Sequence, residues 1–276
     1  MEILINLALA YLYKMIENVL WIALLFLLLG TILKESRKER LFGCFGWTFF
    51  SIYWFGTVAH YIEIDDYFNV VLVCLMAIFC LMIGYHFLTY KGERRDTLIT
   101  LTRATALICL IYFPFAIIGS LNEGIITVTA ILTNMLLNLI SVGTQVAPPI
   151  IFLGNLSIRI ILACTAIESI ALFSGVILSV KAPRDRKFWA FMVSVPVIYL
   201  MNLLRNVIVT TAYVNSWFGT PAHSFHIAHN VLAKIGSMII LIVIAYAVFT
   251  VLPEVLDLIE ETWTLLSGEK GENNAG

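Results

Sequence analysis

Apolar residues in this chain are grouped in long blocks that alternate with short polar linkers. A helix needs about 20 mostly apolar residues to cross the hydrocarbon core of a bilayer, and in lipid its backbone groups must be satisfied within the segment. The blocks therefore predict an all-α, polytopic transmembrane helical bundle, a single membrane-embedded domain over residues 1–276. The seven predicted spans are Glu17–Leu33, Leu41–His60, Tyr67–Leu88, Thr97–Gly119, Ile158–Val180, Phe188–Tyr213 and Ala228–Val251.

A further apolar segment, Ile125–Leu139, has the pattern of a helix that lies on a membrane surface. Its apolar residues share one helical face, and its threonine and asparagine residues gather on the opposite face. We therefore predict an outer interfacial helix over residues 125–142. The prolines Pro148 and Pro149 then interrupt the chain before the fifth span. Residues 1–14 are a second candidate for an interfacial helix.

Lysine and arginine residues are concentrated in every second linker, which predicts the orientation. Basic linkers favour the cytoplasmic side, so the N-terminus is expected outside a cell membrane and residues 252–276 form a cytoplasmic tail. If Ile125–Leu139 crossed the membrane, the third basic linker would move outside, against this bias. The net charge of −1 offers no basic surface for nucleic acid. The basic linkers contain Lys34, Arg37, Lys38 and Arg40, then Lys91, Arg94 and Arg95, then Lys181, Arg184, Arg186 and Lys187.

Polar residues inside the predicted spans are concentrated in the last three. Ionisable groups in a membrane are costly, so they mark functional sites. From the outer ends of their spans, Cys164 is about 9 Å deep, Arg205 is about 12 Å deep and His229 lies at the surface, at 1.5 Å per helical residue. The outer leaflet is therefore expected to hold a thiol, a guanidinium and an imidazole together. The full set is Cys164, Glu168, Asn202, Arg205, Asn206, His229, Asn230 and Lys234.

These residue types suit acyl transfer. A thiolate is a nucleophile, a histidine moves protons near neutral pH, and an arginine that keeps its charge stabilises an oxyanion. Two other interpretations stay open. Cys164 is a packing residue like the other four cysteines, or Arg205 only neutralises Glu168. A transporter or channel is the corresponding alternative function, with Arg205 and Glu168 lining a polar path, although the chain has no internal repeat.

A histidine cluster offers a third class of function. His223, His226 and His229 would span about 120° of one helix face and could bind a metal ion, as in a membrane metalloprotease. Pro221 and the short preceding linker make a helix that begins before His223 doubtful, and no HExxH motif is present. We therefore expect no metal and no cofactor.

Three sequence blocks, in this order, resemble the exosortase/archaeosortase family, and its archaeosortase branch in particular. The resemblance extends over most of the chain and includes the aromatic second span. As an ordered set the blocks are specific, whereas each one alone would be weak. They are Ala163-Cys164-Thr165-Ala166-Ile167-Glu168-Ser169, Asn202-Leu203-Leu204-Arg205-Asn206 and His226-Ile227-Ala228-His229-Asn230.

The resemblance implies a membrane-embedded cysteine transpeptidase whose partners are exported proteins. Family substrates carry a C-terminal signal made of a short motif, a hydrophobic helix and a basic tail, which in archaeosortases is the PGF-CTERM type of surface-layer glycoproteins. The new carboxyl end is expected to be joined to a membrane lipid. Carried over, Cys164 matches the nucleophile and Arg205 the family's arginine. His229 is the match for the third position, with His226 as the alternative one helical turn away. Supporting positions in these blocks are Glu168, Asn202, Asn206, His226 and Asn230.

Overall fold

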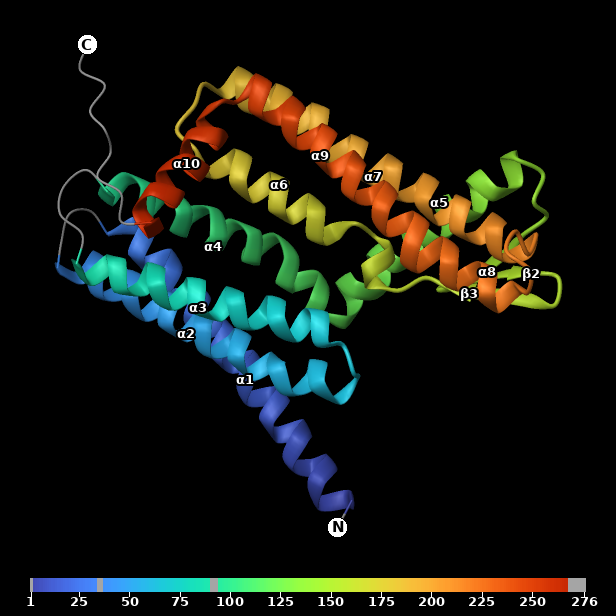
Figure 1. Cartoon of the computed structure of the whole chain (residues 1–276), viewed down its shortest axis with the longest axis horizontal. Coiled ribbons are helices and arrows are strands. Elements are labelled where there is room, and N and C mark those ends of the chain that lie inside the picture. The colour runs from blue at the N-terminus through green and yellow to red at the C-terminus, as the bar shows by residue number, and fades with distance from the viewer. Residues whose placement is uncertain (1, 34–36, 90–93, 268–276) are drawn as a thin grey trace. The chain divides into compact units, whose positions relative to one another are not determined.

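The computed structural model is mostly helical, as predicted, and describes residues 2–33, 37–89 and 94–267, with side chains from Met15 onward (Figure 1). The predictions for Lys34, Lys91 and residues 268–276 lie outside this part of the chain. The elements are α1 (Glu2–Ile32), α2 (Arg37–Glu63), α3 (Tyr67–Thr89), α4 (Arg95–Ile117), α5 (Gly119–Leu139), β1 (Gln145–Ala147), β2 (Ile150–Leu153), β3 (Leu156–Arg159), α6 (Ile167–Ser179), α7 (Arg184–Val214), α8 (Pro221–Ile227), α9 (Ala233–Val251) and α10 (Glu254–Ser267).

Within the described residues, seven helices are long and apolar enough to cross a membrane, which is the predicted number but not the predicted set. Six of them correspond to predicted spans. The predicted fifth span, Ile158–Val180, is not one helix, because only Ile167–Ser179 is α-helical and its 13 residues are short for a crossing. The seventh long helix is instead α5, which begins at Gly119, six residues before the predicted interfacial segment. Its length would allow it to span, so its in-plane position stays a prediction.

A small three-stranded antiparallel sheet accompanies the predicted helical bundle. Strands β1, β2 and β3 occupy the region between α5 and α6, with Ile151 paired to Val146 on one side and to Ile158 on the other. Ile151 and Leu153 are buried while Phe152 between them is exposed, which is the two-residue period of a strand. Gly154, at φ +61°, makes the tight turn into β3. Mean hydropathy could not separate this apolar hairpin from the start of a membrane helix.

The chain divides into two compact units, residues 1–106 with 257–276, and residues 107–256. In the first unit, α2 packs between α1 and α3. α1 is continuous from Glu2 to Ile32, so residues 2–14 extend the first span as one helix, and their position in the interface stays a prediction. The predicted tail includes a helix, since α10 covers Glu254–Ser267, and Thr97 donates a 2.6 Å hydrogen bond to Glu261. Glu39, fully buried, accepts two hydrogen bonds from Arg95, at 2.9 and 2.8 Å.

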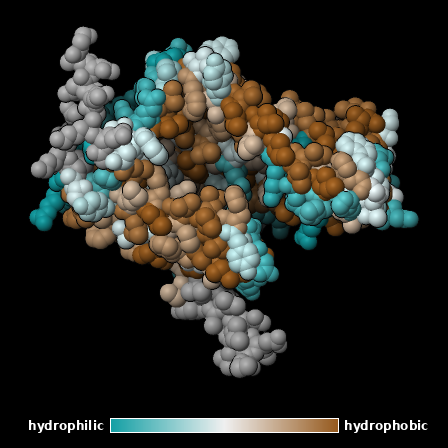
Figure 2. Space-filling model, in the orientation of Figure 1, coloured by the Kyte–Doolittle hydropathy of each residue, from teal (hydrophilic) through white to brown (hydrophobic). Residues whose placement is uncertain are grey.

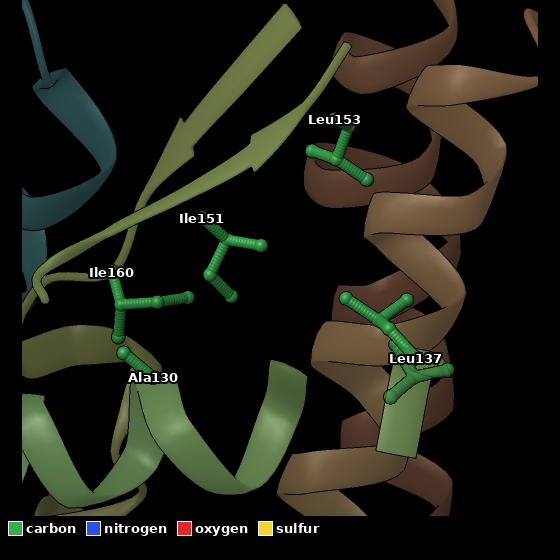
Figure 3. Packing of buried hydrophobic residues seen from close by; sticks show 6 residues of the cluster. Ala130, Leu137, Ile151, Leu153 and Ile160 are labelled. Carbon is green, nitrogen blue, oxygen red and sulfur yellow. The ribbon is translucent and has the colours of Figure 1, made fainter. Parts of the chain in front are cut away.

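The second unit is organised around the long helix α7. α6 and α9 pack on α7, and α5 with the sheet packs on its C-terminal half. The core there joins α5, β2, the end of the sheet and α7 (Figure 3), through Ala130, Leu137, Ile151, Leu153, Ile160 and Val207. α9 carries exposed apolar side chains along its length, including Ile239 and Val243, as expected of a helix that faces lipid. Figure 2 shows the hydrophobic surface over this part of the molecule.

Candidate active site

Cys164 lies at a break between secondary-structure elements, not inside a membrane helix as predicted. It ends a single 3-10 turn, Leu162–Cys164, that follows the sheet. Ala166 then adopts a left-handed conformation, with φ +61°, and α6 begins at Ile167. A non-glycine residue in this conformation is strained, and such strain is concentrated at functional sites. The half-buried cysteine is therefore presented on a tight turn at the N-terminal end of α6.

Two asparagines of α7 anchor the backbone of this turn. The side-chain amides of Asn202 and Asn206 donate hydrogen bonds of 2.7 and 3.0 Å to the carbonyl oxygen of Cys164. Both asparagines are buried, so together they fill the two acceptor sites of one carbonyl group in a place that water does not reach. This pairing fixes the position of Cys164 against α7.

Arg205 is placed on the same side of α7 by helix periodicity. It follows Asn202 by three residues and precedes Asn206 by one, so the three side chains emerge from adjacent positions. The Nε atom of Arg205 is buried and, within the described part of the chain, has no hydrogen-bond partner. A buried unpaired donor costs about 1–3 kcal/mol, which a native protein retains when a ligand supplies the partner.

Glu168 does not neutralise Arg205 in this structure. Among the described residues, the ion pairs include none between these two side chains, although both line the same cavity. Glu168 is exposed, and its Oε1 atom lies 3.5 Å from the hydroxyl of Tyr112, at the limit of a hydrogen bond. The interpretation of Arg205 as half of a structural salt bridge therefore has no support.

His229 lies in a π-helical turn, Ala228–Leu232, that joins α8 to α9. It is half-buried, with its ring stacked on Phe225 at a centroid distance of 5.2 Å. Arg205 and Lys234 are its electrostatic neighbours, which brings the third predicted residue to the same region. Isolated π turns are rare in proteins and are frequently found at functional sites. His226, the alternative, is exposed, as is Asn230.

The three histidines do not form a metal site in the described structure. The helix does begin before His223, contrary to our prediction, because Pro221 occupies its first turn and Thr220 caps it by accepting a hydrogen bond from the His223 amide. Nevertheless, the described residues contain no group of three histidine, cysteine or acidic side chains placed to bind a metal ion. His229 lies within the π turn, whereas His223 and His226 lie on α8, so the three histidines do not share the regular helix on which that hypothesis depended.

A cavity of about 680 Å³ adjoins the cysteine turn and extends between α6, α7 and α9. Leu162, Ala163 and Ala166, the neighbours of Cys164, contribute to its wall. Its charged lining consists of Glu168 on α6, Arg205 on α7 and Lys234 on α9, and most of the remaining wall is apolar. Lys234 had no predicted role, although a lysine inside an apolar span is itself a signal of function.

Comparison with known proteins identifies the family of the chain. Residues 11–249 match the model of the transmembrane exosortase family (Exosortase_EpsH), and this match includes all three sequence blocks around Cys164, Arg205 and His229. The chain therefore belongs to the exosortase family of multi-pass membrane proteins.

Two curated relatives are both archaeosortase A. The protein from Natronomonas pharaonis is 28% identical over 251 residues, covering 80% of this chain and 78% of the relative. The protein from Haloferax volcanii is 26% identical over 260 residues, covering 81% of this chain and 84% of the relative. No solved structure matches the chain.

Proposed function

We propose that this protein is a membrane-embedded cysteine transpeptidase of the archaeosortase type. It cleaves C-terminal sorting signals of the PGF-CTERM kind on exported surface proteins and transfers the new carboxyl end to a membrane lipid. The observation that carries the proposal is the cysteine turn held by Asn202 and Asn206, with Arg205 on the same helix and its Nε atom without a partner among the described residues. Family membership supports this class over a transporter or a metalloprotease.

The first half of the reaction forms a thioester. His229 accepts the proton of the Cys164 thiol, and the sulfur attacks the scissile carbonyl of the substrate. Arg205 stabilises the negative charge that develops on the carbonyl oxygen, because its guanidinium has an unused donor close to the cysteine turn. The C–N bond then breaks, and the histidine returns its proton to the leaving amine.

The second half transfers the acyl group. A head-group amine or hydroxyl of a lipid attacks the thioester carbon, the C–S bond breaks, and the acceptor's proton passes through His229 to the departing sulfur. The largely apolar lining of the cavity supports this outcome over hydrolysis, since limited water near the thioester favours a lipid acceptor. Asn202 and Asn206 act as positioning residues, because their side-chain amides donate to the backbone carbonyl of Cys164.

The test of the proposal is a cysteine replacement series in cells that express a substrate with such a signal. Cys164→Ala should abolish processing, with a loss beyond about 1000-fold, because no other group can form the thioester. Cys44→Ala, Cys74→Ala, Cys80→Ala and Cys109→Ala are the matched controls and should retain processing, as these thiols serve in packing. Immunoblots of the substrate report the result. Processing by Cys164→Ala at the normal rate would end the thioester mechanism.

We also propose that the N-terminus lies outside the cell and the C-terminus inside, as the basic linkers indicate. Single cysteines introduced between Val214 and Ser224 should then react with a membrane-impermeant maleimide in intact cells. Cysteines introduced between Lys181 and Lys187 should react only after the cells are opened. The reverse pattern would place the site on the cytoplasmic side and remove it from exported substrates.

A further inference from the structure

The cavity beside the cysteine turn has the form of a groove with a charged end and an apolar end. Arg205 and Lys234 lie near the end that the neighbours of Cys164 complete. Away from this end the lining is mainly apolar, with Phe173 on α6, Ile198 on α7 and Ala245 on α9. A ligand that fills it must therefore be an amphiphile whose polar end points toward Cys164.

The length of the groove suits a hydrocarbon chain. Lys234 and Ala245 are eleven residues apart on α9, a length of about 16 Å at 1.5 Å per residue. An acyl or isoprenoid chain that begins beside Lys234 can therefore run along the apolar wall as far as Ala245.

The charges at the polar end are complementary to one phosphate group. Arg205 and Lys234 provide two positive charges and Glu168 provides one negative charge, so a single anionic charge balances the lining. Arginine and lysine are the side chains that bind phosphate most often. The buried Nε atom of Arg205, which has no partner in the described structure, would gain an acceptor from the ligand.

We propose that this groove is a binding site for a phospholipid with one anionic phosphate, held by Lys234 and Arg205, with a hydrocarbon chain along α6, α7 and α9. This site places a lipid head group beside the cysteine turn. That the bound lipid serves as the acyl acceptor rests on the function proposed above, but the binding itself does not.

Binding is tested by native mass spectrometry of the full-length protein in detergent. The probes are a phosphatidylglycerol, a diacylglycerol with the same chains but no phosphate, and inorganic phosphate. Phosphatidylglycerol should bind at least about 10-fold more tightly than either partial ligand, and Lys234→Gln should weaken it about 10-fold through the loss of one charged contact. Lys187→Gln, which removes a lysine near the opposite end of α7, is the matched control and should bind normally.

A second variant tests the position of the chain. Ala245→Phe fills the apolar end and should weaken a long-chain phosphatidylglycerol more than a short-chain one. Equal binding of phosphatidylglycerol and diacylglycerol, equal binding by Lys234→Gln and Lys187→Gln, or binding of inorganic phosphate as tight as that of the lipid would each overturn the site.

A separate measurement tests whether the bound lipid is the acyl acceptor. If the bound lipid is the acceptor, the fraction of cleaved product that carries lipid should fall several-fold in Lys234→Gln in favour of a free carboxyl end, whatever the total rate of cleavage. An unchanged lipid-linked fraction would reject the acceptor role while leaving the binding result intact. If instead cleavage does not depend on Cys164, the proposed function fails, and the phosphatidylglycerol titration still decides the binding site.

Discussion

Two arginines, one in each compact unit, are held in opposite ways. In the first unit, Arg95 donates two hydrogen bonds to the buried carboxylate of Glu39, in the bidentate geometry that suits a guanidinium. In the second unit, Arg205 and the acidic Glu168 line the same cavity, yet the ion pairs among the described residues do not join them, and the buried Nε atom of Arg205 has no partner there. Arg95 is therefore paired through its guanidinium, whereas Arg205 keeps a donor that a ligand could use.

The two units also differ in the regularity of their backbone. In the first unit α1, α2 and α3 are long and continuous, and close approach is achieved by glycine, as at Gly46 against Leu27. In the second unit the backbone around the site is interrupted by a 3-10 turn, a left-handed residue at Ala166 and a π turn at Ala228–Leu232. Irregular backbone at membrane depth is tolerated where it lines a cavity or is buried in protein. Regular, closely packed helices are thus found in the first unit, and the candidate site lies where the backbone of the second unit is irregular.

The largest difference between the two arginines is expected in substrate processing, when Arg205 is replaced by lysine. Arg205→Lys keeps the charge but loses the planar donor array, so substrate processing should fall by about 100- to 1000-fold, the usual cost of a lost oxyanion donor. The amount of folded protein in the membrane should stay normal. Arg95→Met should instead reduce the amount of folded protein. It removes the bidentate partner of the buried Glu39 and should lower folding stability by about 3 kcal/mol.

The double variant Glu168→Leu with Arg205→Leu is the decisive control for this pair. If Arg205 only offsets the charge of Glu168, the double variant should be folded and active. We expect it to be folded and inactive. Protein level by immunoblot and processing of a co-expressed substrate are measured on the same samples.

A smaller effect is expected at the histidine. His229→Ala should slow processing by about 100-fold, because it removes a proton-transfer group and leaves the thiol and guanidinium in place. His226→Ala and His223→Ala are the controls, since both side chains are exposed on α8, and they should retain activity. If His226→Ala is the inactive variant, the third catalytic residue lies one helical turn earlier. A loss in all three that added zinc restores would favour the metal hypothesis.

The smallest effect concerns packing in the second unit. A Cβ atom at Gly175 would lie 2.5 Å from the side chain and 2.8 Å from the backbone nitrogen of Ile108, so Gly175→Ala must separate α6 from α4. We expect a loss of about 1–3 kcal/mol in stability, typical of overpacking, measured as a lower midpoint of thermal inactivation in detergent. Gly236→Ala on α9 has nothing within 4 Å and should be neutral or stabilising by about 0.5–1 kcal/mol. Equal effects at both glycines would contradict the close approach of α6 and α4.

Most of the helical fold could be predicted because a membrane imposes a simple rule of length and apolarity. α2, α3, α4 and α7 appear close to the predicted spans, with their ends shifted by a few residues at most. The failure at Ile158–Val180 has a physical cause. An apolar hairpin, a turn and a short helix in succession have the same mean hydropathy as one long helix, so only the two-residue alternation around Ile151 could have separated them.

The residues of the candidate site stand out in the sequence, but their geometry does not. Cys164, Arg205 and His229 are recognisable as polar groups inside apolar blocks, and their catalytic roles stay a prediction. The predicted depth of Cys164 depended on a continuous fifth helix, whereas only Ile167–Ser179 is α-helical there. The contacts of Asn202 and Asn206 with the Cys164 carbonyl depend on that irregular turn, so no helical spacing could have indicated them.

The π turn at Ala228–Leu232 makes the chain one residue longer there than a regular helix would be. Removal of a single residue within it would restore a continuous α-helix and rotate everything on one side by about 100° relative to the other. The ring of His229, now stacked on Phe225, would then turn away from Arg205 even though every side chain of the site remained in the sequence. The number of residues in this turn is thus as much a determinant of the site as their identity, and natural variation in the family should tolerate substitutions there more readily than deletions.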